Sequence, residues 1–169
     1  MKKLGLFLLF VGTIFAQDVT YYKKLKVEED KFEGTRKEIA TFKTPFDISG
    51  TWHYYQIFRF TYKDEPEKES LYLQIKYESD DWLFIESASF KNLDSGWSKD
   101  FSWSYYDASR ETKYGGEIEE RILIPITKEE AIDLLSQKKF TSRIYGKDYY
   151  SEKKVSQTKS VLAMLKILK

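Results

Sequence analysis

Apolar and polar side chains alternate with a period of two along most of the chain between Tyr21 and Ile126. The segment 71–77, LYLQIKY, is the clearest example. This period is the signature of β-strands, in which successive side chains point to opposite faces of a sheet. Turn signals such as Glu33-Gly34 and Gly115-Gly116 separate the alternating segments. The pattern predicts about eight strands, over residues 20–29, 36–42, 51–63, 70–78, 82–91, 99–107, 117–124 and 139–146.

The segment 82–85, WLFI, breaks the alternation because all of its residues are apolar. Such a run is typical of a central strand that is covered on both faces. Short strands separated by turns at this spacing indicate an antiparallel meander. The predicted fold is therefore mainly β: an antiparallel β-sandwich or open barrel of about eight strands, with one short helix and a C-terminal helix.

Two segments near the C-terminus have helical spacing. Thr127-Lys128-Glu129-Glu130 matches a capping box and predicts a helix over residues 128–137. A second helix is predicted to begin near Ser156. Its apolar face, with i, i+3, i+4 and i+7 spacing, would consist of Val161, Met164, Leu165 and Leu168. A helix of this length is marginal alone, so we expect it to dock on a sheet face or an open barrel end.

The N-terminus has the layout of an export signal. Lys2 and Lys3 precede an apolar run over residues 4–15, and Ala16 offers a small residue at the cleavage point. The run is too short to span a bilayer, which takes about 20 apolar residues. The sequence therefore predicts a signal peptide at residues 1–16 and a single β-rich domain at residues 17–169. No transmembrane segment is expected once the signal is removed.

Composition narrows the classes of function. The chain has 169 residues, 41% hydrophobic and 17% aromatic, which suits one folded domain. It has no cysteine and one histidine, which excludes disulfides, thiolate metal sites and cysteine nucleophiles. Removing residues 1–16 takes away two of 28 basic and none of 27 acidic residues, so the net charge changes from +1 to −1. A near-neutral domain is a poor match for nucleic acid, and we expect no nucleic acid, metal or cofactor.

Three stretches together carry a resemblance: KVEEDKFEGTRKEI (26–39), WLFIESASF (82–90) and RIYGKDYYSEKKVSQTKSVLAMLKIL (143–168). They resemble small exported bacterial proteins built on an all-β domain with a closing C-terminal helix. In those proteins an early hairpin carries an Asp-x-Phe-x-Gly-like turn. The resemblance implies an exported β domain, and it carries over no catalytic or binding residue.

Catalytic motifs are few. His53 is the one histidine, and no serine lies in a G-x-S-x-G elbow. We therefore expect His53 to be an ordinary surface residue of a strand. Acidic residues cluster beside predicted turns, where solvated carboxylates are common. These clusters are Glu28-Glu29-Asp30, Asp80-Asp81 and Glu117-Glu119-Glu120.

Tyrosines are the most informative candidates for binding. Neighbouring residues on a strand point to opposite faces, so each Tyr-Tyr pair on a strand places one ring outward. Tyr55, Tyr72 and Tyr106 are predicted to lie outward, and Arg59 is placed to stack on such a ring. An exposed row of tyrosines can hold sugar rings or anchor a protein partner. The alternative interpretation is that these tyrosines only stabilise the sheets through cross-strand pairs.

These observations predict an exported, non-enzymatic binding or interaction module of the bacterial cell envelope, periplasmic or secreted. Its partner is expected to be an envelope protein or a glycan. Two alternatives stay open: a carbohydrate-active enzyme that uses paired carboxylates, and a structural envelope protein whose tyrosine face covers a partner sheet.

Overall fold

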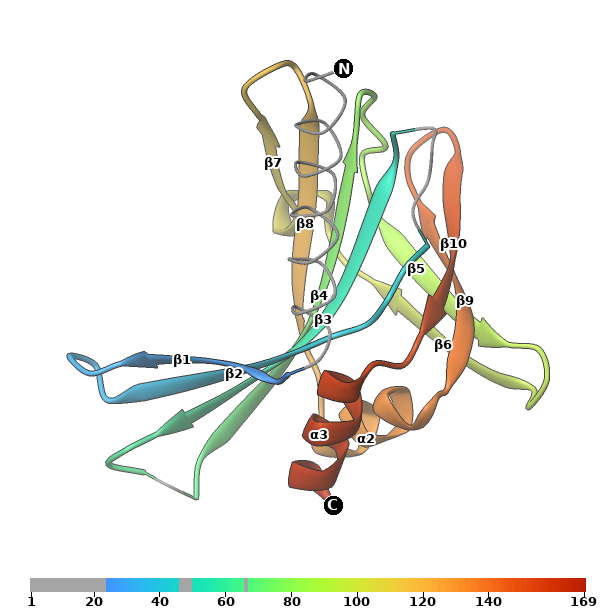
Figure 1. Cartoon of the computed structure of the whole chain (residues 1–169). Coiled ribbons are helices and arrows are strands. Elements are labelled where there is room, and N and C mark those ends of the chain that lie inside the picture. Colours follow the sequence, from blue (N-terminus) through green and yellow to red (C-terminus); the bar gives the residue numbers. More distant parts are fainter. Residues whose placement is uncertain (1–23, 46–49, 66) are drawn as a thin grey trace, which may run out of the picture.

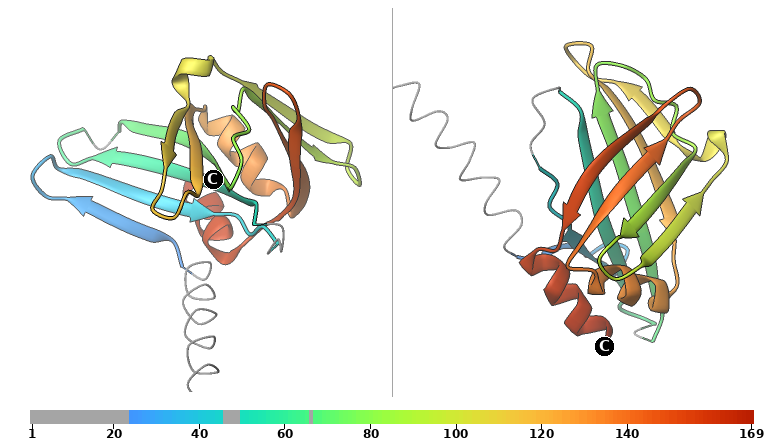
Figure 2. Two further views of the ribbon diagram at one scale, coloured as in Figure 1. Left: turned by 90° about the horizontal axis from the view of Figure 1, so that it is seen from above. Right: turned by 90° about the vertical axis from the view of Figure 1, so that its right-hand side faces the viewer.

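The chain folds into two antiparallel sheets that pack face to face (Figures 1 and 2). A computed structural model describes residues 24–45, 50–65 and 67–169, and ten strands lie within these ranges. One sheet contains β1 (Lys26–Asp30), β2 (Thr35–Thr41), β3 (Trp52–Tyr62), β4 (Glu69–Ser79), β7 (Ser109–Thr112) and β8 (Ile118–Pro125), in the order β1-β2-β3-β4-β8-β7. The other contains β5 (Ser87–Asn92), β6 (Trp97–Ser102), β9 (Lys139–Tyr145) and β10 (Tyr150–Ser156), in the order β10-β9-β5-β6. The mainly β, sandwich-like prediction is confirmed.

The predicted strands differ from the observed ones in four places. Strand β5 begins only at Ser87, and the predicted strand 99–107 ends at Ser102 and gives way to a 3₁₀ turn, η1 (Tyr105–Asp107). Strands β7 and β10 were not predicted, because SRET has no apolar residue and YSEKKVS has only one buried apolar side chain, Val155. Residues 20–23 of the first predicted strand lie outside the described part of the chain.

The apolar run 82–85 is not a strand, because a buried carboxylate binds its backbone. Glu120 of β8 is fully buried, and its oxygens accept hydrogen bonds from the backbone N–H groups of Leu83 (2.7 Å), Phe84 (2.8 Å) and Ile85 (2.9 Å). Phe84 has a φ of 55°, which turns three successive N–H groups toward one acceptor. Arg110 of β7 donates to the same carboxylate from 3.1 Å.

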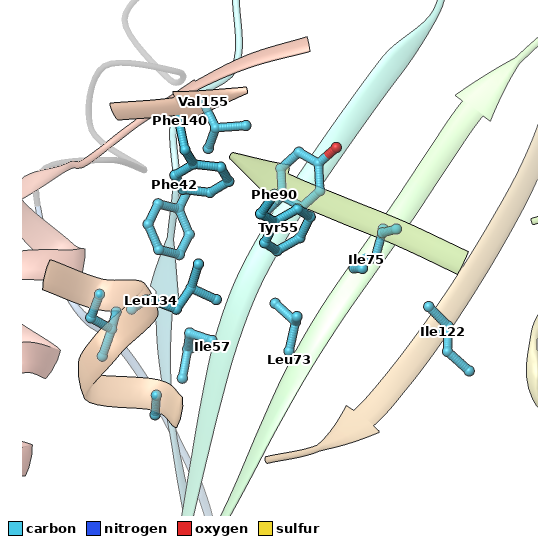
Figure 3. Packing of buried hydrophobic residues seen from close by; sticks show 14 of the residues in the cluster. Phe42, Tyr55, Ile57, Leu73, Ile75, Phe90, Ile122, Leu134, Phe140 and Val155 are labelled. Carbon is cyan, nitrogen blue, oxygen red and sulfur yellow. The ribbon is translucent and has the colours of Figure 1, made fainter. Parts of the chain in front are cut away.

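The core lies between the two sheets (Figure 3). Tyr55 of β3 packs edge-on against Phe90 of β5, with ring centroids 5.4 Å apart, and Phe90 lies 5.1 Å from Phe140 of β9. Aliphatic side chains fill the space around these rings. Those of the six-stranded sheet include Ile57, Leu73, Ile75 and Ile122. Three aromatic rings therefore join the sheets.

Two helices cover one end of the sandwich: α2 (Lys128–Ser136) and α3 (Lys159–Leu168) (Figure 1). The predicted capping box at Thr127 and Glu130 is present. The C-terminal helix docks as expected, since Val161, Met164 and Leu168 are buried. It packs beside α2 and against β2. No helix among the described residues has the length and apolar character needed to cross a bilayer.

The six-stranded sheet continues past the core as a projecting arm, defined as residues 26–38 with 59–65 and 67–70 (Figure 1). Apolar side chains line the inner face of the sheet as far as Ala40, Ile57 and Leu71. The next cross-strand pair on this face is Glu38 and Arg59, so the core ends where the arm begins.

The hydrogen bonds from the backbone of residues 83–85 to Glu120, which we call the Glu120 clamp, yield the first prediction. Replacing Glu120 by Ala removes one member of a buried ion pair and takes the acceptor from the N–H groups of Leu83, Phe84 and Ile85, two of them buried, so unfolding should become easier by about 3–5 kcal/mol. Urea denaturation of the purified protein measures this change. The matched control is Glu111→Ala on β7. That carboxylate is exposed and lies 3.9 Å from Arg121, and its loss should cost about 0–1 kcal/mol. Similar losses in both variants would contradict the clamp.

Candidate functional site

Tyr55, predicted to lie outward, is instead fully buried in the core. The two faces of β3 are the reverse of those expected: His53, Tyr55 and Ile57 face the other sheet. Both faces of β3 carry aromatic residues, so alternation alone does not say which one is covered. Cross-strand register decides it, because Tyr55 pairs with Ile75 and therefore shares its buried face.

The other three candidates lie on different surfaces. Arg59 is on the inner face of the arm, where its guanidinium binds Glu38 at 2.9 Å and Glu69 at 2.8 Å. Tyr72 is on the outer face of β4, half-buried. Tyr106 is 89% exposed but belongs to the 3₁₀ turn η1 rather than to a strand. The structure therefore does not bring the predicted residues together on one face.

The outer face of β3 carries an aromatic surface. We call this surface the outer aromatic row. Its members are Trp52, Tyr54, Phe58, Phe60 and Tyr62 of β3 with Tyr72 of β4. Phe58 is buried and the others are half-buried. The rings of Phe60 and Tyr72 meet edge to face at 5.7 Å, whereas those of Trp52 and Tyr54 are nearly parallel, with an interplanar angle of 16°.

Lysines lie over several of these rings. The Nζ atom of Lys76 is 4.1 Å from the centre of the Tyr54 ring, and that of Lys37 is 4.3 Å from the centre of Phe58. A cation over an aromatic face is attracted by the ring and keeps its charge in water while its stem covers apolar surface. The row is thus a mixed aromatic and cationic surface.

A buried ionic cluster borders the row. Glu78 of β4 and Glu119 of β8 are cross-strand partners, and both accept contacts from Lys113 at 2.6 Å. Burial raises the pKa of Glu78, but hydrogen bonds from Lys113 and Lys76 outweigh it and hold this pKa at about 2. Glu78 is thus ionised at neutral pH and has no proton to donate, which a glycosidase acid requires.

The acidic clusters are only partly solvated, contrary to expectation. Glu28, Glu29, Asp30, Asp80 and Asp81 are exposed, as the turns predicted. Glu119 and Glu120 are buried, because Lys113 binds Glu119 and the backbone of residues 83–85 binds Glu120. No group of His, Asp and Glu side chains within the described residues is arranged to hold a metal ion.

The inner face of the arm forms an open groove of about 740 Å³. Its floor is a ladder of ion pairs in which acidic and basic side chains alternate. The ladder runs through Glu29, Arg36, Glu38, Arg59 and Glu69. The volume is within the range of ligand pockets, but the arginines already have carboxylate partners, so the groove has little unsatisfied charge along its floor.

His53 is a buried residue and not the surface residue expected from its strand. Its Nδ1 is 2.9 Å from the hydroxyl of Tyr55, and its Nε2 is 2.9 Å from Oγ of Ser151 on β10. A serine on an imidazole begins a hydrolase triad, but the third member here is a phenol and not a carboxylate. Burial lowers the pKa of His53 to about 3, which makes the imidazole a weak base. The contacts instead link the two sheets.

No family model, curated protein or solved structure matches this chain. The functional interpretation therefore rests on the surfaces described above. Of these, the outer aromatic row has the residue types that dominate protein-binding surfaces, namely tryptophan, tyrosine and phenylalanine.

The buried histidine predicts a pH dependence. The unfolded chain binds a proton at His53 below about pH 6.5, whereas the folded chain does not until about pH 3. The unfolded state therefore takes up more protons in this window, and stability falls as the pH drops. Between pH 7 and pH 5 the free energy of unfolding should decrease by about 2 kcal/mol, measured by urea titration at each pH.

The variant His53→Gln should flatten this slope between pH 7 and pH 5. Glu78 contributes only below its usual pKa of 4.5, so it does not interfere in that range. An unchanged slope in the variant would show that another group is responsible.

Proposed function

We propose that the protein is an exported, non-enzymatic binding module of the bacterial cell envelope, which holds a protein partner on the outer aromatic row. The partner's surface would lie across β3 and β4 on the side away from the core. Tyrosine, tryptophan and phenylalanine supply large contact areas at low entropic cost. The rings of Phe60 and Tyr72 meet edge to face, so this surface is uneven. An uneven surface fits the side chains of a protein better than it fits a flat ligand.

The observation that carries this proposal is the continuation of the sheet beyond its core. Ordering a residue costs about 1–2 kcal/mol of backbone entropy, and the inner face of the arm buries charged groups instead of apolar ones. Ion pairs return little of that cost, because exposed pairs are screened by water and partly buried ones lose solvation. A segment built in this way supports a role in contact with a partner better than a role in stability.

The tip of the arm supports the same proposal. Phe32 is 100% exposed at the turn between β1 and β2. Its position is fixed, because the carboxylate of Asp30 accepts hydrogen bonds from the backbone N–H groups of Phe32 (2.9 Å) and Glu33 (3.1 Å). An ordered turn that presents a bare aromatic ring is a suitable anchor for a partner.

Site-specific photocrosslinking tests the binding surface. A photoreactive benzoylphenylalanine placed at Tyr62 or Tyr72 in producing cells should give one discrete crosslinked product with an envelope protein, identified by mass spectrometry. The same group at Tyr106 or Tyr114, which are 89% and 107% exposed, is the control for random collision. The proposal fails if these control positions crosslink equally well, or if Tyr62 and Tyr72 give no product.

Export is tested separately. The predicted signal peptide lies outside the described residues, so its support is the order of charge, apolar run and small residue in the sequence. Protein recovered from the non-cytoplasmic fraction should begin at Gln17, as N-terminal sequencing and intact mass determine. A chain that keeps residues 1–16 and stays in the cytoplasm would contradict export and leave the binding surface to be judged by crosslinking.

A further inference from the structure

Four lysines lie in two parallel rows on the outer face of the four-stranded sheet and at its junction with β2. In the first row, Ser156 of β10 is paired with Lys43 on one side and with Lys139 of β9 on the other. In the second row, Thr141 of β9 is paired with Lys154 and Lys91. Each row thus places a hydroxyl residue between two lysines. We call Lys43, Lys91, Lys139 and Lys154 the lysine patch.

The rows point away from the core. Paired residues share a face of the sheet, and the neighbours of these residues along the chain point inward. Those buried neighbours are Phe42, Phe90, Phe140 and Val155. All four lysines are exposed. The patch therefore extends over the neighbouring strands β10, β9 and β5, with Lys43 beside β10.

The patch has a surplus of positive charge. Lys139 forms an ion pair with Asp94 at 2.7 Å, and both side chains are about 70% exposed. Within the described residues Lys43, Lys91 and Lys154 have no acidic partner. The next row along β9 and β10 is different, because Arg143 is neutralised by Glu152 at 2.7 Å. On the described part of this face the positive charge without an acidic partner therefore lies in the two rows, although the chain without residues 1–16 has a net charge of −1.

A hollow and an exposed apolar side chain lie at the same place. A cavity of about 270 Å³ is lined by Lys91, Lys139 and Lys154 with Thr141 and Ser156. Leu93 also lines it and is 85% exposed at the turn between β5 and β6. A cationic surface beside a bare leucine combines the two interactions that hold proteins on a membrane surface.

We propose that the lysine patch binds the phosphate headgroups of an anionic bilayer. Lysines of one row are two strands apart, or about 10 Å, so one small anion cannot contact all four. An array of headgroups can, and the compact ammonium of lysine suits phosphate as a point charge. The hydroxyls of Thr141 and Ser156 lie between the lysines and can donate to phosphate oxygens. Leu93 enters the headgroup layer beside them.

Co-sedimentation with lipid vesicles tests this inference on the exported, processed protein. The protein should bind vesicles made of equal parts phosphatidylcholine and phosphatidylglycerol, and not vesicles of phosphatidylcholine alone. Each lysine removed should lower the partition coefficient about fivefold, so Lys91→Ala with Lys154→Ala should lower it about 25-fold. Added salt should release the protein, since the screening length is about 8 Å at physiological ionic strength.

The matched control is Lys147→Ala, an exposed lysine in the turn between β9 and β10. It removes the same charge outside the patch and should leave vesicle binding within about twofold of the parent, because the attraction falls off within a Debye length of the membrane. Equal losses in control and patch variants would show attraction by net charge only and overturn the proposal. Failure to bind anionic vesicles would also overturn it. A third outcome would also overturn it: inorganic pyrophosphate releases the protein from the vesicles at a concentration where sodium chloride of equal ionic strength has no effect. That result would indicate a site for a free phosphate compound. None of these outcomes bears on the outer aromatic row, which lies on the other sheet.

Discussion

The rest of the structure depends on the buried carboxylate of Glu120. Three consecutive N–H groups of the segment between β4 and β5 need an acceptor, because Leu83 and Ile85 are buried. Glu120 supplies it, and Arg110 balances its charge. This segment is where the chain leaves the six-stranded sheet and enters the four-stranded one. It also approaches the hairpin of β9 and β10 so closely that a Cβ atom on Gly146 would overlap the carbonyl oxygen of Leu83. One carboxylate therefore holds the segment by which the chain passes from one sheet to the other.

The layer that covers the six-stranded sheet determines how far the core extends. The four-stranded sheet and the two helices cover the inner face of the six-stranded sheet only as far as Ile57 and Leu71, and the remaining strand length becomes the arm. Without a covering layer, the inner face carries an ion-pair ladder through Glu38 and Arg59. The outer face of the arm holds aromatic rings under lysines, with Lys37 over Phe60 and Lys68 over Tyr62. Among the described residues, contacts within the sheet itself therefore stabilise the arm.

Sequence periodicity predicted the fold class, most strands and both helices, because each of these depends on residues close together in the chain. The prediction was wrong where a residue far along the chain determines the local structure. The run 82–85 has every apolar feature of a central strand, and only Glu120, far along the chain, makes it irregular. A signal was present: Glu120 occupies an otherwise apolar face of β8 between Ile118 and Ile122. Likewise Tyr55 and Tyr54 are equivalent by alternation, and only the pairing of Tyr55 with Ile75 shows which of the two is buried.

The two proposed contacts are compatible because of how a sandwich is built. Its sheets pack through their inner faces, so their outer faces point in opposite directions. The outer aromatic row is on one outer face and the lysine patch is on the other. The two proposed contacts would therefore let the protein bind a membrane and a protein partner at the same time. The two contacts differ in physics as well. Screening by salt weakens membrane binding through the lysine patch. Partner binding through the outer aromatic row is much less sensitive to salt, because burial of apolar surface drives it. Ionic strength therefore separates them, and a protein released from vesicles by salt should keep its partner.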